Sequence, residues 1–174
     1  LDDTYVATCD QEIYDYIESI GGKAIMTSDR HEHASDRAAE AMLILEKESE
    51  VSIDILVMVQ GDEPMDTPEM IEQALSPILH DDSVNVVNLM GAIANVEEFE
   101  DPNTVKVVTN PNGDAIYFSR EPIPTKSKSG NIPMKKQVCI IPFTRAFLLE
   151  YTELPPTPLE IAESVDMMRV LENG

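Results

Sequence analysis

Residues 53–64 read Ile-Asp-Ile-Leu-Val-Met-Val-Gln-Gly-Asp-Glu-Pro and hold the strongest structural signal in the sequence. The apolar part has the length of one strand, and such a nearly continuous run is typical of a strand buried on both faces, as in a parallel sheet. Two acidic residues follow the run directly, and Pro64 prevents further strand pairing. In open α/β sheets, ligands bind just beyond the carboxyl ends of the strands. We therefore predict that Asp62 lies at a ligand site.

The carboxylate of Asp62 suits a metal–phosphate complex. Magnesium usually takes one or two protein carboxylates and completes its shell with water and substrate phosphates. A turn or helix-cap role is the competing interpretation of an acid in this position. The amide of Gln60 can donate and accept, which suits a sugar hydroxyl or carboxylate or, alternatively, a capping role. Glu63 is expected to bind neighbouring backbone or side-chain groups rather than a metal.

Elements on both sides of this strand alternate in type. The patterns predict strands over residues 4–8, 23–26 and 53–60, and helices over residues 11–20, 35–48 and 67–79. This β-α alternation predicts an α/β fold with a mainly parallel central sheet covered by helices.

The second half of the sequence predicts a mixed, partly antiparallel arrangement. Strands are expected over residues 84–93, 105–109, 115–118 and 138–142, and helices over residues 145–151 and 159–172. A stretch rich in Pro, Ser, Lys and Gly over residues 121–136 predicts a mobile loop. Lys106 is expected to point outward from its strand.

Composition limits the function classes. The 174 residues suit one domain or most of one, and 43% hydrophobic residues can supply a core. A formal charge of −21 argues against nucleic-acid or anionic-membrane surfaces as partners. No segment is apolar and long enough to span a bilayer, and no signal peptide is visible. Cys9 and Cys139 are interpreted as buried free thiols of a cytoplasmic protein.

The loop before the second predicted helix concentrates polar residues. His31, His33, Asp36 and Arg37 lie close in sequence, but their spacing matches no standard zinc pattern. Ser35 or Asp36 could cap the helix. Alternatively, the helix N-terminus and Arg37 could face a nucleotide.

Two further groups could act in catalysis or binding. Arg120 follows a predicted strand and could pair with a substrate carboxylate in a bidentate way, or form a surface ion pair. A three-residue spacing predicts one shared helical stripe for four charged residues, Glu160, Glu163, Asp166 and Arg169. That stripe is either a solvated face or a cleft wall that holds sugar hydroxyls or orients Arg120. The absence of a Walker loop and of a marked nucleophile favours metal-assisted transfer over covalent catalysis.

Ordered motifs across the chain resemble those of the 3-deoxy-manno-octulosonate (Kdo) cytidylyltransferase, or CMP-sugar synthetase, family. The matching stretches are residues 59–65, Asn103 with residues 105–108, residues 117–120 with Ile123-Pro124, and residues 158–160 leading to residues 169–171. The resemblance implies a three-layer α/β/α nucleotide-diphospho-sugar transferase fold. It also implies that a sugar hydroxyl attacks the α-phosphate of CTP and releases pyrophosphate, with Mg²⁺ as cofactor. A cytoplasmic homodimer serving lipopolysaccharide biosynthesis is implied as well.

The resemblance also assigns roles to individual residues. Asp62 becomes the catalytic Mg²⁺ ligand and a contact of the nucleotide. The cytidine is expected beside Ser35, Asp36 and Arg37. The acidic sugar is expected to contact five residues, Gln60, Gly61, Arg120, Gln137 and Asp166. CTP and an acidic sugar are thus the expected partners, with no nucleic acid and no membrane.

The chain departs from the family pattern in three ways. Residues 1–174 are expected to form a single nucleotidyltransferase domain without the family's N-terminal phosphate-binding loop and C-terminal end. Gln137 and Ile141 stand where the family carries His and Tyr, and Asp166-Met167 stands for Glu-Gln. His33-Ala34-Ser35 replaces the usual Ser-Gly-Thr. The expected sugar is therefore Kdo or a related eight- or nine-carbon acid. Another nucleoside triphosphate, or a non-catalytic sugar-nucleotide-binding or assembly subunit, are the alternatives.

Overall fold

A computed structural model describes residues 1–125 and 134–174 of the chain. The predicted alternation of strands and helices in the first half is confirmed within one or two residues at most boundaries. These elements are β1 (Val6–Thr8), α1 (Gln11–Ser19), β2 (Ala24–Met26), α2 (Ala34–Ser49), β3 (Ile55–Val59) and α3 (Pro68–His80). The chain therefore has an α/β fold.

The second half contains more short elements than the sequence predicts. They are β4 (Met90–Ala92), α4 (Val96–Glu100), β5 (Lys106–Thr109), β6 (Ala115–Ser119), β7 (Lys135–Gln137), β8 (Ile140–Thr144), α5 (Arg145–Glu153), α6 (Pro158–Glu163) and α7 (Met167–Asn173). Of the strand predicted over residues 84–93, β4 is a regular strand, and the residues before it pair with β8 through a bridge between Val86 and Phe143 and through backbone hydrogen bonds. Half of the loop predicted over residues 121–136 (residues 126–133) lies outside the described residues, and β7 covers its end.

The sheets correct the predicted strand directions. Only β1 and β2 pair in parallel, whereas β3 pairs antiparallel with β8, and all pairs of the β4-β7-β5-β6 sheet are antiparallel. The prediction of a mainly parallel sheet is therefore wrong for the described strands. An apolar run reports burial of a strand on both faces, but it does not report the direction of the neighbouring strand.

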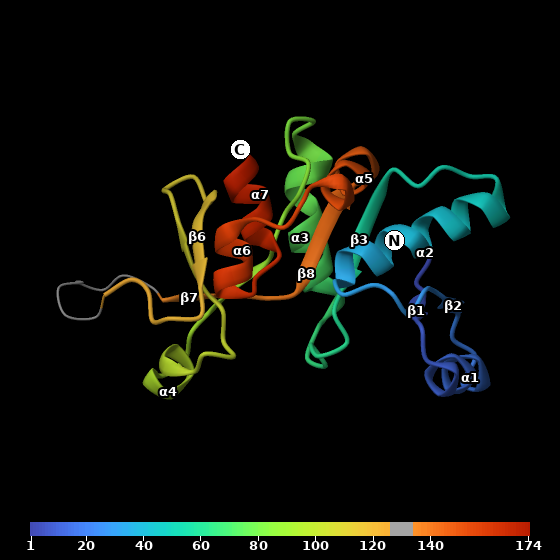
Figure 1. Cartoon of the computed structure of the whole chain (residues 1–174), viewed down its shortest axis with the longest axis horizontal. Helices are drawn as coiled ribbons and strands as arrows, with labels where there is room; N and C mark the ends of the chain where they lie inside the picture. Colours follow the sequence, from blue (N-terminus) through green and yellow to red (C-terminus); the bar gives the residue numbers. More distant parts are fainter. Residues whose placement is uncertain (126–133) are drawn as a thin grey trace.

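Figure 1 shows how these sheets are arranged. The β3–β8 pair lies in the centre, with β1, β2 and α1 at one end of the molecule and β6, β7 and α4 at the other. Helix α2 runs beside β3 and contacts α5, so these two helices, one from each half of the chain, pack together beside the central strands. In the described part of the chain, no helix combines the length and hydrophobicity needed to cross a membrane.

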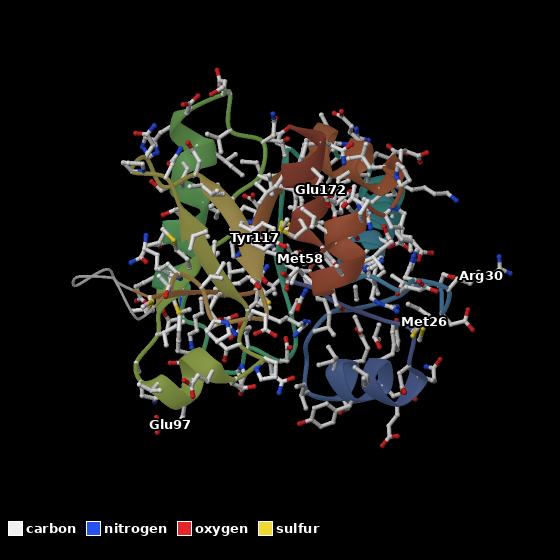
Figure 2. All side chains as sticks on the ribbon, turned by 60° about the vertical axis from the view of Figure 1, so that its left-hand side comes forward. Met26, Arg30, Met58, Glu97, Tyr117 and Glu172 are labelled. Carbon is white, nitrogen blue, oxygen red and sulfur yellow. The ribbon has the colours of Figure 1, made fainter. Side chains whose placement is uncertain are left out.

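The core lies under α2, β8, α5 and α7. Its fully buried members include Met42, Phe143, Leu148 and Tyr151. The rings of Phe143 and Tyr151 pack with centroids 5.9 Å apart in a tilted arrangement, which suits aromatic quadrupoles. Figure 2 shows Met58 of β3 in the interior, while Arg30 and Glu97 project outward.

One predicted helix is broken in two. The helix expected over residues 159–172 stops at Ser164, which has left-handed backbone angles (φ 52°, ψ 53°), and α7 begins after Asp166. The sequence contains no Gly or Pro there, so no local signal marks the break. The bend lets Val165 and Met168 both enter the core. Consequently, the four charged residues predicted to share one helical stripe lie on two separate helices.

Lys106 is fully buried, contrary to the predicted outward position. Its ammonium donates hydrogen bonds to the carbonyl oxygens of Asp101 (2.9 Å), Thr104 (2.6 Å) and Arg120. Burial lowers the pKa of Lys106. The side chain therefore ties the loop before β5 to the residue that follows β6.

The two cysteines differ in environment. Cys9 is exposed, so its predicted burial is wrong, whereas Cys139 is half-buried, and both are free thiols. Burial raises the pKa of Cys139 to about 12, which keeps its thiol protonated and unreactive near neutral pH.

Candidate active site

A cleft of ≈ 1680 Å³ lies between β1 and β3. Its wall includes both strands, the inward face of α2, and the carboxyl end of β3 with Gln60, Gly61 and Asp62. In the described sheets β1 pairs with β2 and β3 pairs with β8, and no strand stands between β1 and β3. This opening explains why Val59 is exposed although it belongs to the central apolar run.

The turn after β3 is fastened to the neighbouring strand. The backbone amide of Gln60 donates to the Cys139 carbonyl (3.1 Å), and the backbone amide of Cys139 donates to the Glu63 carboxylate (3.1 Å). The predicted backbone-binding role of Glu63 is thus confirmed. The Asp62 side chain is exposed, lines the cleft and makes no hydrogen bond to another described residue. Its carboxylate can therefore coordinate a divalent ion without losing a hydrogen bond to any described residue, which fits the few protein ligands that Mg²⁺ needs.

Asp66, in the same turn, has a costly environment. Both of its carboxylate oxygens are buried and have no hydrogen-bond partner among the described residues. Burial, followed by the nearby charge of Glu63, raises the pKa of Asp66. The ionised carboxylate therefore destabilises the fold at neutral pH.

Replacing Asp66 with the similarly shaped leucine is expected to increase the free energy of unfolding by about 1 kcal/mol at pH 7, because an unpaired buried polar group is removed. The pKa of Asp66 is higher in the folded than in the unfolded protein. The destabilisation by its ionised carboxylate is therefore complete above the folded pKa and disappears as the pH falls below the unfolded pKa. Urea unfolding of both proteins at pH 7 and pH 3.5 measures this. An equal gain at both pH values would contradict the charge argument.

The beginning of α2 forms a second part of the cleft wall. Arg37 lines it and donates to the Thr27 hydroxyl (2.6 Å) and the Ser28 carbonyl (3.2 Å). Ser35 is fully buried beside the Tyr151 phenol, and it and Asp36 are not part of the described cleft wall. The N-cap of α2 is His33, rather than Ser35 or Asp36 as the sequence suggested.

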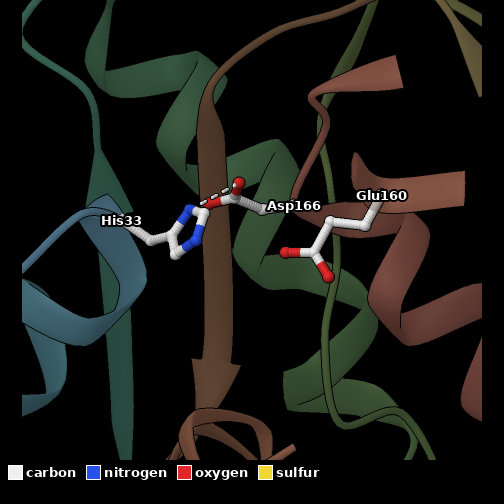
Figure 3. A group of neighbouring side chains, drawn as sticks. All are labelled: His33, Glu160 and Asp166. Carbon is white, nitrogen blue, oxygen red and sulfur yellow. Dashed lines mark hydrogen bonds and ion pairs between the residues drawn. The ribbon is translucent and has the colours of Figure 1, made fainter. Parts of the chain in front are cut away.

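A cluster on α6 and α7 completes this side of the cleft. Asp166, predicted to contact the sugar, lines the cleft, and its Oδ1 lies within hydrogen-bonding distance of His33 Nδ1 (3.1 Å). Figure 3 shows the imidazole of His33 facing the carboxylates of both Asp166 and Glu160. Burial raises the pKa of Asp166, and the contact with His33 opposes this shift. His33 was not among the predicted site residues, and its position in the predicted nucleotide loop was the available signal.

His33, Asp166 and Glu160 each offer one atom that could ligate a metal, and these atoms lie within 4.8 Å of one another. Both oxygens of Glu160 are, however, already bonded to the Arg169 guanidinium, at 2.5 and 2.8 Å. The negative charge of Glu160 is thereby neutralised, and Asp62 remains the better candidate for Mg²⁺.

Arg120 is placed outside the described cleft wall. Its guanidinium donates to the backbone carbonyls of Glu163 (2.7 Å), Ser164 (2.9 Å) and Pro102 (3.0 Å). The carboxylate of Glu163 in turn accepts hydrogen bonds from the Arg120 amide, the Tyr117 hydroxyl and the Ser119 hydroxyl. These hydrogen bonds hold the end of β6 against the end of α6. The sequence indicated this contact only through the possibility that the predicted charged helical face, which includes Glu163, orients Arg120.

Gln137 also lies away from the described cleft wall. Its amide nitrogen donates to the Asn88 side chain (2.6 Å). Ile141 and Met167, two of the positions that depart from the family pattern, are buried in the core. Neither side chain lines the described cleft.

Comparisons with known proteins agree with these features. A family model described as cytidylyltransferase matches residues 1–174. A 3-deoxy-manno-octulosonate cytidylyltransferase of Geobacter metallireducens is 38% identical over 100% of this chain and 70% of that protein. One of Fusobacterium nucleatum is 41% identical over 100% of this chain and 69% of that protein.

Solved structures agree as well. A CMP:2-keto-3-deoxy-manno-octonic acid synthetase complexed with CTP is similar with a TM-score of 0.88 and 37% identity, over 100% of this chain and 69% of that chain. A putative glucose-1-phosphate thymidylyltransferase from Bacillus anthracis, at 15% identity and a TM-score of 0.53, shares the fold alone. With the family model, the relatives and the Asp62 cleft in agreement, the chain belongs to the cytidylyltransferase family.

Proposed function

We propose that this protein transfers CMP from CTP to Kdo or a related acidic 2-keto sugar and releases pyrophosphate. The exposed carboxylate of Asp62, at the end of β3 and in the wall of a large cleft, is the observation that supports this most. The proposal also rests on the relatives that are named Kdo cytidylyltransferases and on the similar synthetase complexed with CTP.

The reaction forms a bond between a sugar hydroxyl oxygen and the α-phosphorus of CTP and breaks the bond to the β-phosphate. Such a transfer needs no protein nucleophile, because positioning and charge neutralisation supply most of the acceleration. Asp62 would hold Mg²⁺, which when bound neutralises the triphosphate charge. Arg37 and the N-terminus of α2 offer N–H donors on the same cleft wall, where a nucleotide anion is favoured.

The sugar would approach from the side of Gln60, Gly61 and Asp166, which line the same cleft. Gln60 can donate and accept hydrogen bonds, as recognition of hydroxyls and a carboxylate requires. Arg120 and Gln137 would take part only if their present partners were exchanged for the sugar. Assembly as a homodimer and a cytoplasmic role in lipopolysaccharide biosynthesis belong to this proposal as well.

Pyrophosphate release tests the proposal directly. The protein is incubated with Mg²⁺, each of the four nucleoside triphosphates and a panel of 2-keto sugar acids that includes Kdo. Release with CTP and one eight- or nine-carbon acid is the expected result. Turnover with UTP or GTP instead would change the nucleotide, and CTP binding without release for any sugar would favour a non-catalytic subunit.

A further inference from the structure

The N-cap residues of α2 and α7 bond to each other rather than to the first amides of their own helices. His33 precedes α2 and Asp166 precedes α7, and neither side chain bonds to the first backbone amides of its helix. Instead, the two side chains bond to each other over a sequence separation of 133 residues. Both side chains are therefore engaged in a long-range contact, and neither satisfies the first amides of the helix that it precedes.

The pair lies in a polar site that is partly shielded from water. The side chains of His33 and Asp166 are 31% and 27% exposed. Asp166 is also held through its backbone carbonyl, which accepts a hydrogen bond from the Tyr151 hydroxyl (3.0 Å). Glu160 lies near the other side of the His33 ring, and Arg169 neutralises Glu160 (Figure 3). Among the described residues, His33 is the side chain that hydrogen-bonds to the Asp166 carboxylate.

The pair joins two different parts of the cleft wall. His33 sets the start of α2, where Arg37 faces the cleft, and Asp166 faces the cleft from the start of α7. The contact between His33 and Asp166 is therefore a direct link between these two parts of the wall.

We propose that His33 and Asp166 act as a positioning pair that links the nucleotide side of the cleft to the sugar side and sets the affinity for both substrates. This inference rests on the proposed function, because it assigns the two sides of the cleft to two substrates. Removal of either partner releases the other, so the start of α2 and the start of α7 are no longer held in fixed positions relative to each other. The loss is expected in binding rather than in the chemical step, because neither residue contacts Asp62.

A double-mutant cycle tests the pair. The variants are His33→Asn, Asp166→Asn and their combination, and the matched control is His31→Asn. His31 belongs to the same loop and pairs with Glu40, but it is not part of the described cleft wall. Steady-state kinetics give KM for CTP, KM for the sugar acid and kcat, and urea unfolding of the substrate-free variants gives the stability of each protein.

Each single variant is expected to raise both KM values about three- to tenfold and to change kcat less than twofold. The double variant should be no worse than the worse single one, because the same contact is lost only once. His31→Asn should leave both KM values unchanged. Changes that multiply in the double variant, or equal changes in the His31 control, would overturn the proposal.

The unfolding cycle separates this inference from the proposed function. A lack of nucleotidyl transfer by the unmutated protein would refute the function. The urea midpoints would then still decide whether the pair interacts, since a non-additive cycle supports the contact and an additive one refutes it.

Discussion

Replacing Asp62 with alanine is expected to reduce the rate of pyrophosphate release by about 10²- to 10³-fold or more, the range found when one preorganised electrostatic group is lost from an active site. The physical reason is that Mg²⁺ must neutralise the triphosphate charge as the bond to the leaving pyrophosphate breaks. Asp62, the exposed carboxylate at the end of β3, would hold this ion. Folding should be nearly unaffected, because the side chain makes no hydrogen bond to other described residues.

Two measurements check this expectation. Initial rates at increasing Mg²⁺ concentration should show that the variant needs more Mg²⁺ than the unmutated protein, and urea unfolding should show matching midpoints. Asp82→Ala is a matched control, because Asp82 is an exposed acid in a loop outside the described cleft wall. Unchanged turnover by Asp62→Ala would remove this residue from the mechanism.

The position of Asp62 could be predicted because it depends on local rules. An apolar run of strand length ends, two acids follow, and the chain must turn at Pro64, so the carboxylate comes at the end of the strand whichever strand lies beside it. The direction of the neighbour could not be predicted in the same way. β8 pairs antiparallel with β3 from about 80 residues further along the chain, and the burial pattern of β3 is compatible with either direction.

Tertiary contacts decided the remaining differences. Lys106 resembles an outward-facing strand residue until the three carbonyls that surround its ammonium are known. Ser164 adopts left-handed backbone angles without being glycine, because the bend lets Val165 and Met168 be buried and presents two carbonyls to Arg120. The site was affected likewise, since Arg120 was predicted from its chemistry but its bonding partners come from a distant helix.

The ion pair between Glu160 and Arg169 has the largest expected effect on stability. Both residues are 3% exposed, and the guanidinium bonds both carboxylate oxygens while lying 4.8 Å from the centre of the Tyr151 ring. Glu160→Gln is expected to lower the free energy of unfolding by about 3–5 kcal/mol, because it leaves the buried Arg169 charge uncompensated. Chemical denaturation at pH 7 measures the change.

The loss of stability in Glu160→Gln is expected to depend on pH, whereas a loss caused by poorer packing would not. Burial is the largest influence and alone would raise the pKa of Glu160, but the hydrogen bonds from Arg169 and from the Thr157 amide, together with the charge of Arg169, outweigh it and hold the pKa below its ordinary value. The stabilisation is therefore complete above the unfolded pKa and is lost as the pH falls through the folded value. The difference in the free energy of unfolding between the unmutated protein and Glu160→Gln should thus become smaller at acidic pH.

Two further variants separate charge from packing. Glu160→Leu combined with Arg169→Met should recover much of the stability, because no unpaired charge remains in the core. Glu46→Gln breaks a comparable bidentate pair with Arg145, whose side chain is 38% exposed, and should cost much less, since water can solvate the guanidinium that is left. If Glu160→Gln were as stable as Glu46→Gln, or if its difference from the unmutated protein did not become smaller at acidic pH, the buried pair would not be what holds α6 against α7.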